Sequence, residues 1–201
     1  MQLLSNTTSP YGRIARIAMI EKGLEVEPTM VDPWADDPRL RAANVASRVP
    51  TLILDDGTAL TESLLIVQWL EHTRPTPSLL GNNPSNATEI AGVAMGVIDA
   101  SIHTLITRKV TAPVLFDETP IGLRRRRTMA EGLARLESLI EKLSLIKYTG
   151  TPTLDIITAV VTLDYLRFRF PDAAWMPATP FLDVLSKQWR VRSSFATTVP
   201  R

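Results

Sequence analysis

The sequence predicts an α/β unit followed by an all-helical region. Residues 1–73 alternate short strand-like runs with helix-like segments, which is the pattern of an α/β unit. Beyond residue 85 the apolar side chains recur at helical spacing. Residues 75–84 are rich in Pro, Gly and Asn, which is typical of a connection between domains. We therefore predict two domains, at residues 1–74 and 85–201.

The first helix of the α/β unit has a recognisable start and stop. A short apolar strand at residues 1–5 is followed by a turn at residues 6–10 that is rich in Asn, Thr, Ser and Pro. Apolar residues then recur at helical spacing as far as Gly23, which favours a helix end. Pro10 suits the first helical turn, because the backbone donor that it lacks would be unpaired there. Ser9 is therefore predicted to be the N-cap residue.

The Ser9 hydroxyl has two interpretations. It caps its own helix, since serine is among the preferred residues at that position. Alternatively, it donates a hydrogen bond to a bound thiol beside a helix N-terminus, which favours anions. A free thiol has a pKa of about 8.5, such surroundings lower it, and the thiolate is the nucleophile. In the second interpretation the protein activates a thiol that it binds.

Val49 and Pro50 precede a β-branched, apolar strand, and the Asp56-Gly57 pair that follows this strand is a strong hairpin signal. Proline is tolerated at the start of a strand, which is one interpretation. A cis bond would instead turn the backbone of Val49 toward a cleft, where it would pair with an extended peptide as a strand edge does. The sequence leaves both open.

Glu62 and Ser63 open the next predicted helix. Thr61 or Glu62 at this start fits helix capping and compensation of the helix dipole. The Glu62-Ser63 pair has a second interpretation. It also fits binding of the amino-acid end of a zwitterionic ligand, with the hydroxyl and free N–H groups on its carboxylate and Glu62 on its ammonium. Together with Ser9 and Val49, these are the groups that a small peptide thiol needs, and they indicate glutathione.

Several segments, spread over essentially the whole chain, resemble those of the cytosolic glutathione S-transferases, in particular a bacterial branch. The segments are Ser9-Pro10-Tyr11 with Arg13 and Arg16, Glu21-Lys22-Gly23, Pro33-Trp34, Val49-Pro50-Thr51-Leu52, Glu62-Ser63-Leu64-Leu65-Ile66, Trp189 and Arg192-Ser193-Ser194-Phe195. The resemblance implies a thioredoxin-like N-terminal domain, an all-helical C-terminal domain and a homodimer that binds glutathione mainly through the first domain.

The resemblance also implies roles for single residues. Ser9 matches the activating serine of serine-type transferases, and Thr8 beside it is a competing hydroxyl donor. Val49 matches the residue that pairs with the cysteinyl backbone of glutathione, and Pro50 matches the cis-proline of the family. The Glu62-Ser63 pair matches the γ-glutamyl binders. The chain has no cysteine, which excludes the cysteine-type branches and thiol exchange through a protein thiol.

A hydrophobic co-substrate pocket is assigned from residue type and position. Trp34, in the loop after the second predicted strand, fits either a hydrophobic plug or a border of the glutathione site. Ile102, His103 and Ile106 lie near the middle of the first helix of the C-terminal domain. With Tyr11, these residues are our candidates for an apolar pocket that takes a small hydrophobic electrophile.

Composition limits the other partners. With 22 basic and 21 acidic residues, the formal net charge is +1, which gives no general attraction to nucleic acid or membranes. The run Arg124–Arg127 favours a solvated helix surface over a nucleic-acid patch, because Glu131 and Glu137 follow on the same helix. The chain has two histidines and no cysteine, so no metal site is predicted.

Localisation is predicted from three further features. The N-terminus lacks a secretory signal, and no apolar run approaches the length that spans a bilayer. The absence of cysteine is compatible with a reducing compartment. We expect a cytoplasmic protein with no membrane partner.

A long apolar helix is predicted near the end of the chain. It runs from about Pro152 to Phe168, and Thr151 is its predicted cap. Its side chains are mostly apolar around the whole circumference, so we expect it to be the buried centre of the C-terminal domain.

These observations lead to one functional hypothesis and two rivals. The leading hypothesis is a glutathione transferase that conjugates the glutathione thiolate to a small hydrophobic electrophile. The first rival is a non-catalytic protein of the same fold that binds glutathione or acts through its surface, since fold does not settle function. The second is a specialised glutathione-dependent lyase, isomerase or dehalogenase.

Overall fold

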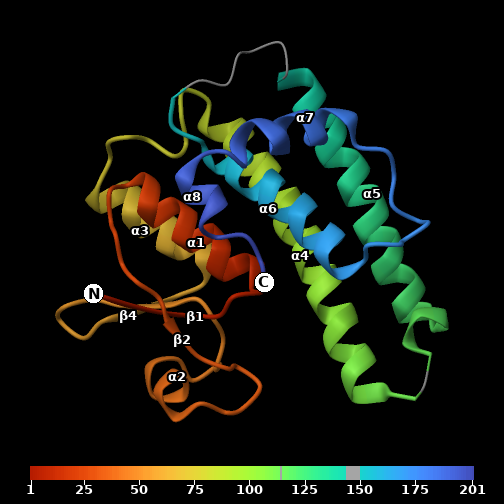
Figure 1. Cartoon of the computed structure of the whole chain (residues 1–201), viewed down its shortest axis with the longest axis horizontal. Helices are drawn as coiled ribbons and strands as arrows, with labels where there is room; N and C mark the ends of the chain where they lie inside the picture. Colours follow the sequence, from red (N-terminus) through yellow and green to blue (C-terminus); the bar gives the residue numbers. More distant parts are fainter. Residues whose placement is uncertain (114, 144–149) are drawn as a thin grey trace. The chain divides into compact units, whose positions relative to one another are not determined.

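The N-terminal residues form a mixed sheet with strand order β2-β1-β3-β4 (Figure 1). The computed structural model describes residues 1–113, 115–143 and 150–201. Its strands are β1 (Gln2–Ser5), β2 (Thr29–Met30), β3 (Thr51–Ile53) and β4 (Ala59–Thr61). Strand β2 runs parallel to β1, whereas β3 is antiparallel to both β1 and β4. The hairpin predicted at Asp56-Gly57 is confirmed, with Gly57 at a φ of 87°.

Three helices follow the strands of this sheet: α1 (Pro10–Glu21), α2 (Pro38–Ala43) and α3 (Ser63–Thr73). Helices α1 and α3 lie side by side on one face of the sheet, and α2 lies on the other (Figure 1). Ile14 and Ile17 of α1 are fully buried. On the opposite face, Leu40 of α2 packs with Leu4 and Val49.

In the described part of the rest of the chain, the regular elements are all helices. The elements are α4 (Pro84–Thr111), the short 3-10 helix η1 (Phe116–Glu118), α5 (Pro120–Leu143), α6 (Leu154–Arg169), α7 (Pro180–Trp189) and α8 (Ser193–Ala196). The chain divides into two compact units, one of Met1–Leu79 with Arg190–Arg201 and one of Leu80–Trp189. The C-terminal segment with α8 thus belongs to the first unit, where α8 contacts α1. The fold is a thioredoxin-like unit with a helical remainder, as the sequence predicts.

Helix α6 is the core of the second unit. Every residue from Leu154 to Leu166 is buried, because α6 packs against both α4 and α7. The predicted burial is confirmed, but the predicted start is wrong. Thr153, in extended backbone conformation, is the N-cap residue, and its carbonyl accepts the first helical hydrogen bond from the N–H of Ile157 at 3.0 Å. Thr151 and Pro152 therefore lie outside the helix.

Although the sequence predicts no apolar run that approaches the length of a bilayer span, helix α4 is long and apolar enough to cross a membrane by length and composition. It has 28 residues, and an 18-residue window of it reaches a mean hydropathy of 1.5. By length and composition alone, this helix meets the criterion for a membrane-spanning helix. Its apolar residues are interrupted by Gly, Ser and Asp, so the sequence shows no continuous run. In the structure 44% of the window is buried, where α4 packs on α5 and α6. A core helix of a soluble protein passes the same test.

Candidate functional site

Ser9 is the N-cap of α1, as predicted. Its backbone is extended, with φ of −69° and ψ of 120°, and its Oγ accepts a hydrogen bond from the N–H of Gly12 at 3.1 Å. Pro10 occupies the first helical position. A hydroxyl that accepts one hydrogen bond still carries its own proton. Capping therefore leaves the Ser9 O–H able to donate to a ligand, and the two interpretations of this residue are compatible.

The loop before Ser9 is held by a residue that sequence reasoning missed. The Oδ1 of Asn6 accepts hydrogen bonds from the backbone N–H of Ser9 at 2.7 Å and of Thr8 at 3.3 Å. Asparagine favours such local turns, because its side chain bonds to the backbone a few residues further on. An Asn at the first position of the turn was the available signal. Asn6 thus fixes the position of both candidate hydroxyl donors.

A close approach between β1 and α1 fixes the direction in which α1 begins. A Cβ at Gly12 would lie 2.4 Å from the Oγ of Ser5, a residue that is fully buried. Real Cβ atoms essentially never approach other heavy atoms this closely. Glycine at this position therefore lets the first turn of α1 sit directly against the end of β1.

Ser63 is the first residue of α3, and its side chain is buried without a hydrogen-bond partner among the described residues. The residue is 2% exposed, and within the described residues its Oγ has no hydrogen-bond partner. A buried hydroxyl without a partner costs about 1–3 kcal/mol, and such groups in folded proteins need an explanation. The first turn of α3 also carries backbone N–H groups that no side-chain cap satisfies. This corner of the fold is therefore rich in unused donors.

Glu62 adopts a strained conformation and does not cap α3. Its φ is 64° with ψ of 120°, a region that costs a non-glycine residue about 1–3 kcal/mol. Its carboxylate makes no capping hydrogen bond, so the capping interpretation of Glu62 is wrong. Instead its Oε1 pairs with Arg48 at 2.6 Å, and both side chains are about half exposed or more. Strain of this kind clusters at functional sites, and an exposed ion pair contributes little to offset it.

The peptide bond between Val49 and Pro50 is cis, which decides the alternative that the sequence left open. Val49 is 8% exposed and lies immediately before β3. Among the residues that the structure describes, the main-chain groups of Val49 have no hydrogen-bond partner. They remain available to an extended ligand.

The strand register brings these segments together. Thr51 at the start of β3 pairs with Leu4 near the end of β1 on one side and with Thr61 at the end of β4 on the other. Three segments therefore meet at the same end of these strands: the loop with Ser9, the Val49-Pro50 bond and the Glu62-Ser63 pair. Three stretches that are distant in the sequence converge within the first unit.

The predicted co-substrate residues are divided between the two units. Tyr11 is half-buried on α1, and Trp34, in the loop between β2 and α2, is 55% exposed. On α4 in the second unit, Ile102 and Ile106 are half-buried and His103 is exposed. Their common pocket stays a prediction. Within the described residues, no group of three or more His, Cys, Asp or Glu side chains is placed to hold a metal ion.

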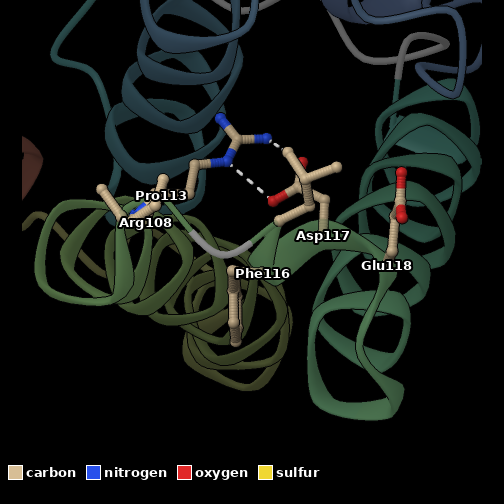
Figure 2. Close-up of a pocket in the computed structure, with 7 residues that line it drawn as sticks. Arg108, Pro113, Phe116, Asp117 and Glu118 are labelled. Carbon is tan, nitrogen blue, oxygen red and sulfur yellow. Dashed lines mark hydrogen bonds and ion pairs between the residues drawn. The ribbon is translucent and has the colours of Figure 1, made fainter.

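A cavity of about 340 Å³ lies in the second unit, beside the C-terminal end of α4 (Figure 2). Arg108 and Asp117 both line it and bind each other, with the Nε of Arg108 2.8 Å from the carboxylate. The hydrogen bond lowers the pKa of Asp117 and raises that of Arg108. Arg108 also stacks over Phe170 at 5.1 Å. Arg108 and Asp117 already satisfy each other, so we assign this pair a structural role.

Comparisons with known proteins identify the family of this chain. The family described as glutathione S-transferase, N-terminal domain, matches residues 3–78. The structure of a glutathione S-transferase from Methylobacterium radiotolerans, in complex with glutathione sulfonate, is 33% identical and has a TM-score of 0.86. The match covers 99% of this chain and 94% of that chain.

Two curated relatives extend the comparison. A GST-like protein of Escherichia coli, YibF, is 28% identical over 203 residues, covering 100% of this chain and 98% of that protein. Maleylacetoacetate isomerase from Pseudomonas aeruginosa is 32% identical over 142 residues, covering 67% of this chain and 66% of that protein. On the combined match of fold, N-terminal domain and full-length relatives, this chain belongs to the glutathione S-transferase family.

Proposed function

We propose that this protein is a glutathione transferase of the serine type, which binds glutathione in its first unit and transfers the thiolate to a small hydrophobic electrophile. The observation that carries the proposal is the buried hydroxyl of Ser63, which has no hydrogen-bond partner among the described residues and lies next to the strained Glu62. Such an arrangement is unfavourable without a ligand and favourable with one that supplies a carboxylate. The glutathione sulfonate in the Methylobacterium radiotolerans structure supports the choice of ligand.

The γ-glutamyl end of glutathione is assigned to the first turn of α3. Its carboxylate would accept hydrogen bonds from the Ser63 hydroxyl and the free N–H groups, and the helix dipole favours an anion there. Its ammonium would lie on the carboxylate of Glu62, which Arg48 already holds. The cysteinyl backbone would pair with the main-chain groups of Val49, as an added strand does at a sheet edge.

The thiol of glutathione is assigned to the loop that Asn6 orders. Donation by the Ser9 hydroxyl and the N-terminus of α1 would lower the pKa of this thiol by about one unit or more from its usual value of about 8.5. The thiolate then attacks an electrophilic carbon, a C–S bond forms, and the leaving group departs with its electron pair. Catalysis would rest on stabilisation of the thiolate and on proximity.

Ser63→Ala is the sharpest test of the binding site. Loss of its hydrogen bond should weaken glutathione about tenfold or more, while the free protein should be as stable as the parent or slightly more so. A purely structural serine behaves differently. Ser101, buried on α4, donates to the carbonyl of Ile98 at 2.7 Å, so Ser101→Ala should cost about 1 kcal/mol of stability and leave glutathione affinity unchanged. Unchanged glutathione affinity in Ser63→Ala would contradict the proposal.

Ser9→Ala tests the activating role. We expect the ultraviolet absorption of the bound thiolate and kcat with chlorodinitrobenzene to fall, with little change in glutathione affinity. Thr8→Val is the matched control, because it removes the neighbouring hydroxyl from the same loop. If Thr8→Val lowers the thiolate signal and Ser9→Ala does not, the roles of the two residues are reversed. If glutathione binds without any conjugate above background, the protein is a binding protein.

Isomerisation is the second candidate, and the match to the Pseudomonas aeruginosa maleylacetoacetate isomerase favours it. The two reactions differ in their balance of glutathione. A cis–trans isomerisation adds the thiolate and then releases it, so glutathione is returned, whereas conjugation consumes it. Measuring free thiol during turnover of a maleyl substrate and of chlorodinitrobenzene distinguishes the two activities.

A further inference from the structure

The loop between β1 and α1 uses its backbone donors within the protein. The N–H groups of Thr8 and Ser9 donate to the Oδ1 of Asn6, at 3.3 and 2.7 Å. The N–H of Gly12 donates to the Oγ of Ser9, and Pro10, as a proline, has no N–H. Free N–H groups at the start of a helix are the usual alternative to a hydroxyl for holding an anion. Here these amides are already paired, so the hydroxyls of the loop are the donors that remain.

Asn6 makes this arrangement with one end of its amide. The atom that accepts two N–H donors is the oxygen, so the NH2 group is the other end. Within the described residues this NH2 group forms no hydrogen bond, and Asn6 is half-buried. Aspartate suits such a turn as well as asparagine does, and its charged oxygen accepts stronger hydrogen bonds. The stability of the turn alone therefore does not explain a neutral side chain at this position.

The electrostatic surroundings of the loop give a reason for the neutral side chain. Residues 6–10 include no charged side chain. The charged residues on the segments next to the loop are Arg13 on α1, Arg201, whose carbonyl accepts from Thr7, Asp32 after β2, and the Arg48–Glu62 ion pair. The ion pair has no net charge, and Asp32 is exposed to water, which screens it. A half-buried carboxylate at position 6 would be a new and less screened anion.

We propose that Asn6 is a positioning residue of the reaction and that it has to be neutral. This inference rests on the proposed function, in which glutathione places its thiolate beside Ser9. Through its Oδ1, Asn6 fixes the backbone of Ser9 and engages the neighbouring amides, so that hydroxyls donate to the sulfur. Because it carries no charge, it also leaves the pKa of the bound thiol low, since an anion beside a thiolate would raise that pKa.

Asn6→Asp keeps the acceptor and the size of the side chain and adds one negative charge. The two N–H donors keep the new carboxylate ionised above about pH 5. We expect the pKa of bound glutathione, read from thiolate absorption at increasing pH, to rise by about 0.5–1.5 units. The pH profile of kcat with chlorodinitrobenzene should move upward equally, so that kcat below the parent pKa falls about three- to thirtyfold and recovers at higher pH. The affinity for S-hexylglutathione, which has no free thiol, should change less than about twofold.

Two control variants match this change elsewhere in the chain. Asn83→Asp makes the same substitution at the N-cap of α4, where the Oδ1 accepts the N–H of Asn86 at 3.2 Å. Arg127→Gln makes the same change in net charge at an exposed position of α5. Neither should alter the pKa of the bound thiol by more than about 0.2 units. A rise in either control equal to that in Asn6→Asp would assign the effect to net charge and overturn the proposal.

A double-mutant cycle tests whether Asn6 acts through Ser9. Asn6→Ala removes the acceptor without adding a charge, so the backbone of Ser9 is no longer fixed. Ser9→Ala should therefore raise the thiol pKa less in the Asn6→Ala background than in the parent. Additive effects of the two substitutions would overturn the positioning role. If Asn6→Asp does not fold, this cycle alone decides.

The proposed function and the role of Asn6 fail in different ways. If the parent protein does not bind S-hexylglutathione, or does not lower the pKa of bound glutathione, the proposed function is wrong and the role of Asn6 falls with it. If the parent does both, and Asn6→Asp leaves the thiol pKa unchanged, only the role of Asn6 is wrong.

Discussion

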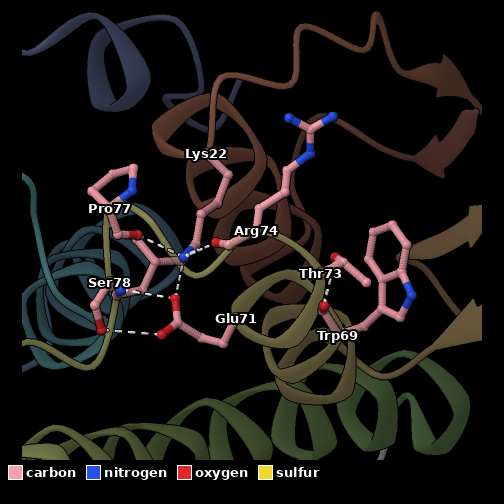
Figure 3. A network of polar contacts seen from close by, with 8 residues as sticks. Lys22, Trp69, Glu71, Thr73, Arg74, Pro77 and Ser78 are labelled. Atoms are coloured by element: carbon pink, nitrogen blue, oxygen red, sulfur yellow. Dashed lines mark hydrogen bonds and ion pairs between the residues drawn. The ribbon is translucent and has the colours of Figure 1, made fainter.

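Lys22 should be among the most sensitive positions of the first unit (Figure 3). It caps the C-terminal end of α1, and its side chain is completely buried. Its Nζ donates to the backbone carbonyls of Arg74 and Pro77, at 2.6 Å each, and pairs with the carboxylate of Glu71. One ammonium thus ties the end of α1 to the end of α3 and to the chain that leaves α3.

Glu71 completes the network from the other side. Its carboxylate accepts hydrogen bonds from the backbone N–H of Leu79 at 2.8 Å and from the Oγ of Ser78 at 3.1 Å, and its side chain is 16% exposed. Both partners of the ion pair are therefore largely removed from water and fully hydrogen-bonded. This is the geometry in which removing one charge leaves the other uncompensated.

Lys22→Met keeps the length of the side chain and removes its three donors. The carboxylate of Glu71 would stay buried without its cation, and two carbonyls would lose their donors. Breaking such a pair costs about 3–5 kcal/mol of the free energy of unfolding. In the Lys22→Met/Glu71→Gln double variant the uncompensated charge is gone, so the cost should fall to about 2–3 kcal/mol, mainly for the two carbonyls.

Hydrogen exchange of the amides in β1 and β3, measured at increasing urea, gives the stability of the first unit separately from the second. The parent protein and the Arg127→Gln variant provide the reference. A loss below about 1 kcal/mol in Lys22→Met would refute the reasoning, because it would mean that the pair is solvated as a surface pair is. A double variant less stable than Lys22→Met would refute it too.

Two further predictions concern local geometry. Gly12→Ala should destabilise the first unit by about 1–3 kcal/mol and weaken glutathione binding, because the new Cβ would lie 2.4 Å from the Oγ of Ser5. Thermal unfolding measures the loss of stability, and a glutathione titration measures the loss of affinity. Gly92→Ala on α4, where nothing lies within 4 Å, is the control and should stabilise by about 0.5–1 kcal/mol; equal effects of the two changes would argue against the close contact. The side-chain hydrogen bond from Arg39 lowers the pKa of Asp37 to about 2, and we expect a titration followed by carboxyl-carbon NMR to give this value. Because the pKa of Asp37 is depressed from 3.8, the stabilisation by its carboxylate is complete above pH 3.8 and is lost as the pH falls through about 2. Arg39→Gln should return the pKa of Asp37 toward its ordinary value. An unchanged pKa in this variant would exclude Arg39 as the cause.

Local signals in the sequence were sufficient for much of the fold. The start of α1 at Ser9-Pro10, its end at Gly23 and the hairpin at Asp56-Gly57 each follow from the backbone preferences of one or two residues. Of these residues, Ser9 also belongs to the candidate site. A signal of this kind acts within a few residues, so it survives without knowledge of the neighbours in space. The start of α6 was misplaced because Thr151 and Thr153 offer the same local signal.

Other properties are set by pairing between distant segments, and only the tertiary structure decided them. The register of β1, β3 and β4 brings Ser9, Val49 and Ser63 to the same end of these strands. The sequence places a hydroxyl at Ser63, but its burial without a partner depends on how α3 packs. The segment Arg190–Arg201 joins the first unit through contacts such as that of Arg192 with Glu21, at 2.6 Å. Such contacts join residues far apart in the chain, and no periodicity or capping pattern encodes which distant residue will be the partner.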